Sequence, residues 1–93
     1  MGYVVISYDI SDDRTRNKVA NLLADYGKRV QYSVFECRLD AKTLRKLVEK
    51  LKPFAEGNGN DSIRVYQICE ACLKKAVLLG RGELTEEPEF HFV

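Results

Sequence analysis

The sequence predicts an α+β fold in which two helices pack against one antiparallel sheet. Segments rich in β-branched and aromatic residues, with alternating side-chain character, are separated by segments whose apolar residues recur at helical spacing. A length of 93 residues suits one compact unit spanning residues 1–93. The core of such a short chain is modest, so dimerisation would help to stabilise it.

The first predicted elements are a strand and a helix. Residues 3–10 (YVVISYDI) are β-branched and aromatic, and they predict a buried strand that ends near Asp9. Three residues that can cap a helix and place negative charge in its first turn come next: Ser11, Asp12 and Asp13. The apolar face of this helix consists of Val19, Leu22, Leu23 and Tyr26. Gly27 is expected to end it.

The middle of the chain contains a strand segment and a second helix. Residues 29–39 (RVQYSVFECRL) have strand composition, and their pattern allows either one long strand or two. Asp40 can cap the helix, and Pro53 predicts a bend or an early end. The apolar face of this helix is formed by Leu44, Leu47, Val48, Leu51 and Phe54.

The last third of the chain contains a loop followed by strand segments. Residues 57–61 (GNGND) predict the loop, and residues 63–69 (IRVYQIC) predict a strand. Residues 77–79 have the composition of a short strand, and residues 89–93 (EFHFV) predict a terminal strand set off by Pro88. If the middle segment forms a hairpin, the chain has the β-α-β-β-α-β order of a ferredoxin-like sandwich, with an extra C-terminal strand.

The composition is that of a soluble globular protein, with 45% hydrophobic and 31% charged residues. No stretch approaches the roughly 20 apolar residues that span a bilayer, so no membrane association is expected. The N-terminus lacks the basic region and cleavage site of a secretory signal, and three cysteines suit a reducing compartment. We therefore expect a cytoplasmic protein.

The net charge of +1 hides an asymmetry along the chain. Residues 1–82 carry all 15 lysines and arginines and ten of the 14 acidic residues, a net charge of +5, whereas residues 83–93 carry four glutamates. A weakly basic body with an acidic tail is compatible with nucleic-acid binding but does not establish it.

Asp9 is the first candidate for chemistry, because functional groups often lie where a strand ends. The simpler interpretation is a solvated carboxylate or a residue that starts the helix. One carboxylate makes a poor magnesium site, since Mg²⁺ prefers octahedral oxygen ligation. If the strand ends met across a two-fold axis, however, two copies of Asp9 could share one metal ion and activate a water against a phosphodiester. Asp12 and Asp13 are already explained by capping.

Basic side chains could form a surface around this predicted strand end. They are Arg14, Arg16, Lys18, Lys28 and Arg29, which could bind phosphates or could simply be solvated. A second row of basic residues follows the second helix. It is more simply interpreted as a solvated outer face than as a surface that binds a duplex backbone. Its members are Lys42, Arg45, Lys46, Lys50 and Lys52.

Aromatic and polar residues near the strand ends are further candidates. Tyr8, Tyr32 and Phe35 could stack on bases, although aromatic residues in strands more often lie in the core. Ser33 could donate to a phosphate or satisfy the backbone.

Other motifs give weaker signals. Cys69 and Cys72 form a C-x-x-C motif. The second ligand pair of a zinc site is missing, and the motif alone is not evidence of redox catalysis. His91 is more simply structural, and no P-loop, dinucleotide-binding glycine motif or H-E-x-x-H occurs.

Four motifs follow one another along the chain: Y-D-I at 8–10 with Asp12-Asp13 and Arg16 after it, Y-G at 26–27, R-V-Q-Y-S-V-F-E at 29–36 and D-S-I-R-V-Y at 61–66. In this order and spacing they resemble the CRISPR-associated adaptation endonuclease family, the second of the two core spacer-acquisition proteins. The resemblance covers nearly the whole chain, and the combination is specific where Y-D-I alone would not be.

The resemblance implies a ferredoxin-like homodimer in which Asp9 of each protomer faces the other across a cleft and binds a shared Mg²⁺, or Mn²⁺ with the same oxygen ligands. It implies metal-dependent cleavage of single-stranded RNA or double-stranded DNA and a partnership with the CRISPR integrase during spacer acquisition. It also implies a break between two strands within residues 29–39 and a last strand that packs on the partner protomer's sheet.

Several positions carry over from the family. Arg16 and Arg29 match its basic positions, and Lys18 keeps the charge at a position where some members have arginine. Ser33 and Phe35 match positions near the cleft, where we also place Tyr8.

Two alternatives stay open. The protein could be a non-catalytic scaffold that holds duplex DNA for the integrase, or a ribonuclease toxin of similar fold. The sequence does not choose between RNA and DNA. A role for the acidic segment at residues 83–89 in docking the integrase is a hypothesis.

Overall fold

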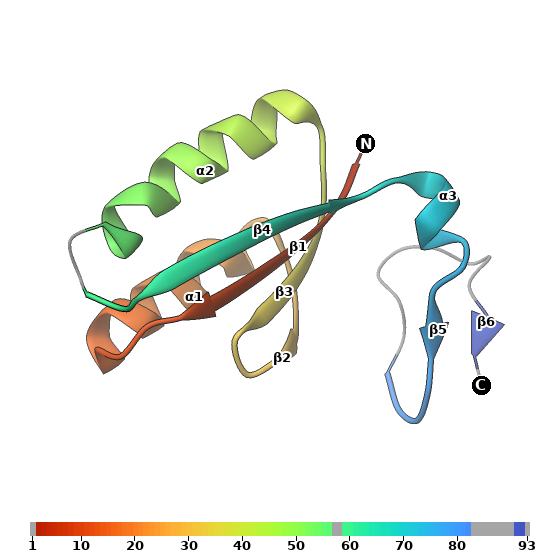
Figure 1. Cartoon of the computed structure of the whole chain (residues 1–93), viewed down its shortest axis with the longest axis horizontal. Coiled ribbons are helices and arrows are strands. Elements are labelled where there is room, and N and C mark those ends of the chain that lie inside the picture. The colour runs from red at the N-terminus through yellow and green to blue at the C-terminus, as the bar shows by residue number, and fades with distance from the viewer. Residues whose placement is uncertain (1, 57–58, 83–90, 93) are drawn as a thin grey trace.

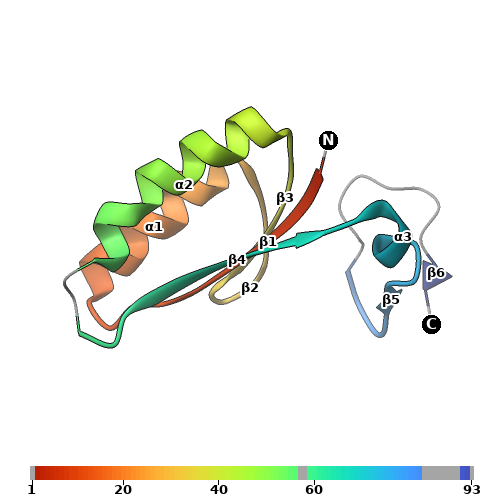
Figure 2. The ribbon, with the colours of Figure 1, turned by 45° about the horizontal axis from the view of Figure 1, so that its top comes forward.

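The computed structural model describes residues 2–56, 59–82 and 91–92. Its centre is a four-stranded antiparallel sheet in the order β2-β3-β1-β4. The strands are β1 (Gly2–Asp9), β2 (Gly27–Gln31), β3 (Val34–Leu39) and β4 (Ser62–Ile68). Helices α1 (Asp13–Ala24) and α2 (Ala41–Ala55) lie on the same side of the sheet, as Figures 1 and 2 show. The predicted α+β fold and its β-α-β-β-α-β order are confirmed.

The main core lies between the sheet and the two helices. Because side chains alternate along a strand, one face of the central strand β1 points toward the helices and the other points away from them. The buried residues on the helix side are Val4, Ile6, Tyr8, Ile10, Val19, Leu23, Phe35, Cys37, Leu39, Leu44, Leu47 and Leu51. The predicted apolar faces of both helices therefore lie where the periodicity puts them.

Both long helices begin at an aspartate, as the sequence predicts. The Asp12 carboxylate accepts a hydrogen bond from the Thr15 backbone N–H at 2.8 Å, and the Asp40 carboxylate accepts one from Thr43 at 2.7 Å. Each bond satisfies a backbone donor that the first helical turn leaves unpaired. The second helix continues two residues past Pro53 before it ends.

The first helix ends earlier than its apolar spacing suggests. It stops at Ala24, so Tyr26 packs on the core from a turn and not from the helix. Gly27 is already the first residue of β2. A Cβ atom there would lie 2.4 Å from Cys37 Sγ and 2.4 Å from the Glu36 carbonyl oxygen, so the close approach of β2 to β3 requires a glycine at this position.

The strand segment at residues 29–39 is two strands. A two-residue turn, Tyr32-Ser33, connects β2 to β3, and the pairing register shifts between Arg29 and Gln31. The break that the family resemblance implies is therefore present.

The C-terminal part of the described chain lies to one side, beyond the end of β4 (Figure 1). A short helix α3 (Glu70–Leu73) follows, which the sequence did not predict. It is joined to the sheet by the buried contact of Leu73 with Tyr3 and by an Arg38–Glu70 ion pair of 3.2 Å. It leads into β5 (Val77–Leu78), which pairs in parallel with β6 (His91–Phe92).

The expected terminal strand at residues 89–93 is described only at His91–Phe92, and the acidic segment at 83–89 lies outside the described residues. None of the helices in the described part of the chain has the length and apolar character that a membrane-spanning segment requires.

Candidate functional site

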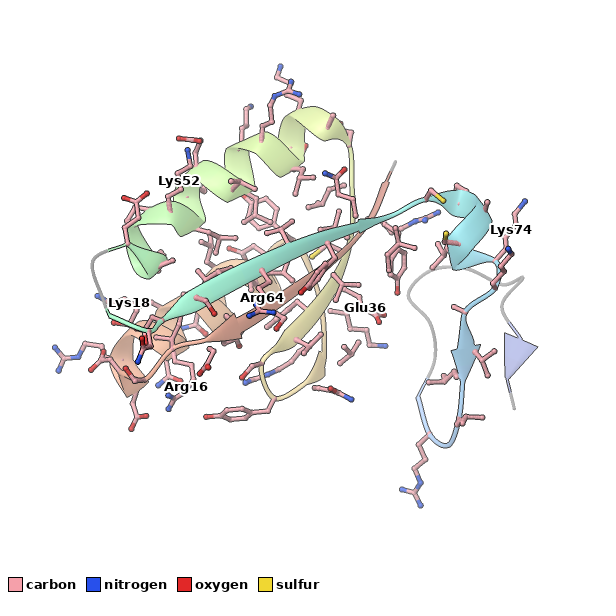
Figure 3. All side chains as sticks on the ribbon, viewed as in Figure 1. Arg16, Lys18, Glu36, Lys52, Arg64 and Lys74 are labelled. Carbon is pink, nitrogen blue, oxygen red and sulfur yellow. The ribbon has the colours of Figure 1, made fainter. Side chains whose placement is uncertain are left out.

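Asp9 is the last residue of β1, and its side chain is exposed. It lies opposite Ser62 of β4, while Ser7, on the same face of β1, lies opposite Arg64. The pKa of Arg64 is raised, chiefly by a hydrogen bond with Tyr66 and in smaller part by the charge of Asp9. The open face of the sheet therefore presents a carboxylate and a guanidinium near the end of β1; Figure 3 labels Arg64 on β4.

Arg16 joins the start of α1 to the end of β1. Its Nη1 donates to the carbonyl of Ile10, the residue after Asp9, at 2.9 Å. Its Nη2 pairs with the Asp13 carboxylate, and this hydrogen bond is the largest cause of the raised pKa of Arg16. The guanidinium is therefore fixed beside the backbone that follows Asp9.

The tip of the β2–β3 hairpin lies against the same strand end. The Tyr8 backbone N–H donates to the Ser33 carbonyl at 3.0 Å, and the Tyr8 hydroxyl lies 3.5 Å from the Tyr32 carbonyl oxygen. Arg29 donates to that Tyr32 carbonyl from Nε at 3.1 Å and from Nη2 at 2.6 Å. The structure thus brings Arg16, Arg29 and the end of β1 together.

Arg14 and Lys18 point outward from α1 and are exposed; Figure 3 labels Lys18 on this helix near Arg16. Lys28 is exposed on β2. The structure places these three near the Asp9 end of the sheet or on the adjoining edge, but gives them no fixed contact with Asp9. Along α2, the basic row is also exposed, and two of its members have local partners: Lys50 donates to the Tyr26 hydroxyl at 2.8 Å and Lys52 pairs with Glu49 at 2.6 Å.

Two of the expected cleft residues are core residues within the protomer. Tyr8 and Phe35 are 3% and 2% exposed, and their rings stack with centroids 6.4 Å apart. Burial leaves neither ring face free for a base. Ser33 is half-buried in the hairpin turn, where its carbonyl accepts the bond from Tyr8.

Arg64, which the sequence did not single out, and Tyr32, for which the sequence favoured a place in the core, both belong to this region. Tyr32 is 68% exposed at the hairpin tip, although tyrosine in a strand segment is more often buried. Arg64 lies beside Asp9 only because of the long-range pairing between β1 and β4. The D-S-I-R-V-Y motif contains Arg64 but does not reveal its neighbour.

The carboxylates around Asp9 already have partners. Asp12 caps α1, as predicted, and Asp13 lies in the first turn of the helix and pairs with Arg16. Asp61 accepts two hydrogen bonds from Ser11, from the backbone N–H and the hydroxyl, each 3.1 Å long. Within residues 2–56, 59–82 and 91–92, no three His, Cys, Asp or Glu side chains converge on a metal position.

Cys69 and Cys72 lie apart from this site, at the start of α3. The Cys72 backbone N–H donates to Cys69 Sγ at 3.4 Å, and both thiols are free and exposed. Cys37 is buried in the core. The C-x-x-C motif is thus a local cap and gains no third cysteine as ligand.

An open groove of about 650 Å³ separates β2 from the segment after β5. Lys28 and Arg29 line it from β2, and Arg81 lines it from the other side, together with the apolar Leu78 and Leu79. Basic character therefore extends from the hairpin along the outer edge of the sheet.

Comparison with known proteins identifies the family. Residues 1–76 match the family described as CRISPR associated protein Cas2. The chain is 42% identical over 91 residues to "CRISPR-associated endoribonuclease Cas2 3" of Chloroflexus aurantiacus, covering 98% of this chain and 97% of that relative. It is also 42% identical over 81 residues to "CRISPR-associated endonuclease Cas2 2" of Thermus thermophilus, covering 87% and 84% of the two chains.

A solved structure supports the same assignment. A chain in a structure titled "Partial Cas6-RT-Cas1--Cas2 complex" superposes with a TM-score of 0.70 at 32% identity, covering 82% of this chain and 88% of that one. Sequence and fold agree over most of the length, so the chain belongs to the Cas2 family of CRISPR-associated proteins.

Proposed function

We propose that this protein is a metal-dependent endonuclease of CRISPR spacer acquisition, and that phosphodiester cleavage takes place at the end of β1. The relatives named endoribonuclease and endonuclease support this activity. The observation that carries the proposal is the exposed Asp9 carboxylate, with the Arg64 guanidinium near it and the Arg16 guanidinium on the carbonyl of the next residue, Ile10. A carboxylate among cations is suited to a reaction on a negatively charged backbone.

The metal site is proposed to form between two protomers. Mg²⁺, or Mn²⁺, prefers carboxylate and water oxygens, and no three possible ligands converge within the described residues of one protomer, so Asp9 would need a second copy. In a two-fold homodimer, the Asp9 side chains of both protomers could hold one ion across the axis. When bound, the ion would supply positive charge against the scissile phosphate.

The open face of the sheet is the proposed dimer surface. Val5 and Tyr66 lie on this face opposite each other on β1 and β4, and Tyr66 is 51% exposed. Asp9 is on the same face, so packing two such faces together would bring the two carboxylates to one cleft. The last strand is proposed to extend onto the partner's sheet.

Basic side chains are proposed to hold the nucleic acid. Arg16 and Arg29 are fixed at the strand end and would bind phosphates next to the scissile bond. Arg14 and Lys18 are exposed on α1 and would bind phosphates further along the strand. The Ser33 hydroxyl would donate to a phosphate oxygen at the cleft.

The test compares the wild type with Asp9→Asn, which keeps the shape of the side chain and removes its charge. Cleavage of labelled RNA and duplex DNA with Mg²⁺ should fall at least about 100-fold in Asp9→Asn and should stop with a chelator. Asp25→Asn is the matched control, because Asp25 is an exposed carboxylate at the other end of α1. Equal cleavage by pure Asp9→Asn protein would refute the proposed site.

A second candidate function is architectural, with the chain holding duplex DNA for the CRISPR integrase. It is favoured by the absence of a cluster of metal ligands in the described part of the chain and by the similarity to a chain in a structure whose title names Cas1 and Cas2 together. Integration of a short duplex by purified integrase partner distinguishes the two. Integration that persists in Asp9→Asn while cleavage is lost assigns both roles to one protein, and integration without cleavage by the wild type leaves only the architectural role.

A further inference from the structure

Tyr32 has an unusual position for a large aromatic residue. It is 68% exposed, the most exposed of the five tyrosines in the chain. A single exposed aromatic side chain is ordinary by itself. Tyr32 differs from an ordinary exposed aromatic residue because two arginine side chains lie over its ring.

Two cations from separate elements lie over the Tyr32 ring. The Arg29 guanidinium carbon is 5.6 Å from the ring centroid and that of Arg16 is 5.8 Å away. Arg29 also holds the Tyr32 backbone carbonyl through two hydrogen bonds. The ring is therefore held in place by two guanidinium groups while most of its surface stays open to solvent.

The turn that carries Tyr32 is not built from the residues that two-residue hairpin turns prefer. Such turns favour Asn-Gly, Asp-Gly or Gly-containing pairs, whereas this turn is Tyr32-Ser33. The register shift between Arg29 and Gln31 marks a bulge, which twists a hairpin and redirects its tip. Departures from local preference of this kind are typical of functional positions.

We propose that Tyr32 is a base-stacking residue that binds an unpaired nucleotide, with the adjoining phosphates on Arg16 and Arg29. An aromatic ring can stack only on a base whose face is free, so the substrate class is single-stranded nucleic acid, RNA or DNA. The nucleotide would lie beside the scissile position, because Arg16 also contacts the Ile10 carbonyl next to Asp9. This inference rests on the proposed function in taking nucleic acid as the substrate.

Binding without cleavage tests the inference separately from catalysis. With a chelator present, a fluorescent 12-nucleotide single strand and its duplex are titrated with wild type, Tyr32→Ala and Tyr32→Phe. Tyr32→Ala should bind the single strand about 5- to 100-fold more weakly, and Tyr32→Phe should stay within about twofold of the wild type because it keeps the ring. Duplex affinity should be the same for all three proteins.

The salt dependence separates stacking from charge. The slope of log affinity against log salt should be unchanged in Tyr32→Ala, whereas Arg29→Ala should make it shallower, because only the arginine neutralises a phosphate. Equal loss of single-strand and duplex binding in Tyr32→Ala, or no loss at all, would overturn the inference.

A direct probe is available because the chain contains no tryptophan. Tyr32→Trp should show fluorescence quenching by the single strand and none by the duplex, as expected when an indole stacks on a free base. Asn21→Trp, an exposed position on α1, is the control and should respond to neither. Quenching at both positions, or at neither, contradicts stacking at Tyr32.

The outcome of this experiment does not depend on the nuclease assay. If Tyr32-dependent single-strand binding is found but Asp9→Asn cleaves like the wild type, the stacking inference stands and the proposed catalytic site fails. If cleavage depends on Asp9 but Tyr32→Ala binds like the wild type, the proposed catalytic site stands and the stacking inference fails.

Discussion

The guanidinium of Arg29 closes the β2–β3 hairpin by donating two hydrogen bonds to the backbone carbonyl of Tyr32, at 3.1 Å and 2.6 Å. Arg29 belongs to β2 and Tyr32 to the turn that follows it. A lysine ammonium carries the same charge but cannot reproduce this forked pair of bonds. Arg29 is therefore expected to position the hairpin tip as well as to attract phosphate.

The variant Arg29→Lys tests this role. It should lower the cleavage rate about 10- to 100-fold, because a displacement of about 1 Å near the reacting groups has an effect of this size. Circular dichroism should show an unchanged fold. Arg45→Lys, at an exposed position on α2, is the matched control and should stay within about twofold of the wild type. A full rate in Arg29→Lys would show that charge alone suffices.

Gly27 is predicted to be the least replaceable glycine in the described part of the chain. In Gly27→Ala the new methyl group would meet Cys37 Sγ and the Glu36 carbonyl oxygen, each at 2.4 Å, so the two strands must separate. Overpacking of this kind costs about 1–3 kcal/mol of unfolding free energy. Urea denaturation monitored by circular dichroism measures the loss.

Gly2→Ala is the control for this prediction. Its nearest contact would be the Leu39 carbonyl oxygen at 3.4 Å, an ordinary van der Waals distance, so the urea midpoint should barely move. Equal midpoints for Gly27→Ala and the wild type would mean that β2 shifts without cost and that the close approach is not required.

The sequence predicted the elements whose signals are local. The strand expected at residues 3–10 is Gly2–Asp9, and Asp12 and Asp40 cap the helices they were expected to cap. Periodicity works here because each helix buries one stripe of apolar residues against the sheet. Asp9 could be placed at a strand end because the β-branched and aromatic run before it is also a local signal.

The parts that the sequence missed depend on contacts between distant residues. Gly27 was expected only to end a helix, but its close contact with Cys37 of β3 appears only once the strands pair. Arg64 becomes a neighbour of Asp9 through the antiparallel register of β1 and β4, which no local pattern encodes. Tyr32 lies in a turn without glycine, so the pattern allowed one strand or two and favoured a buried ring.

The two aspartate caps predict a pH dependence of stability. Hydrogen bonds from Thr15 lower the pKa of Asp12, and hydrogen bonds from Thr43 lower the pKa of Asp40. A carboxyl whose pKa is depressed by folding stabilises the fold above its unfolded pKa of about 3.9, and this contribution disappears as the pH falls through the folded value.

The double variant Asp12→Asn/Asp40→Asn isolates the charge, because asparagine is also a good helix cap. Its melting temperature should be a few degrees below that of the wild type at pH 7 and equal to it near pH 2. Asp25→Asn, at the C-terminal end of α1, should not be destabilised at pH 7, since a negative charge is unfavourable there. A melting difference that is the same at both pH values would contradict the assignment to the carboxylate charges.

Cys69 is predicted to be the most reactive of the three thiols. Its pKa is lowered, first by the hydrogen bond from the Cys72 backbone N–H and then by the Cys72 side chain, whereas the same side-chain bond raises the pKa of Cys72. Burial raises the pKa of Cys37 to about 11. Because the thiolate is the nucleophile, iodoacetamide at pH 7.5 should label Cys69 first, then Cys72, and Cys37 last.

Peptide mass spectrometry over a time course measures this order, and labelling in urea should give three similar rates because the fold no longer distinguishes the thiols. Cys72→Ala separates the two causes. It keeps the backbone N–H that donates to Cys69 Sγ at 3.4 Å and removes the second thiol. Cys69 should therefore remain faster in folded Cys72→Ala than in the urea-unfolded protein, and a rate equal to the unfolded one would show that the Cys72 side chain, not the backbone at the start of α3, activates Cys69.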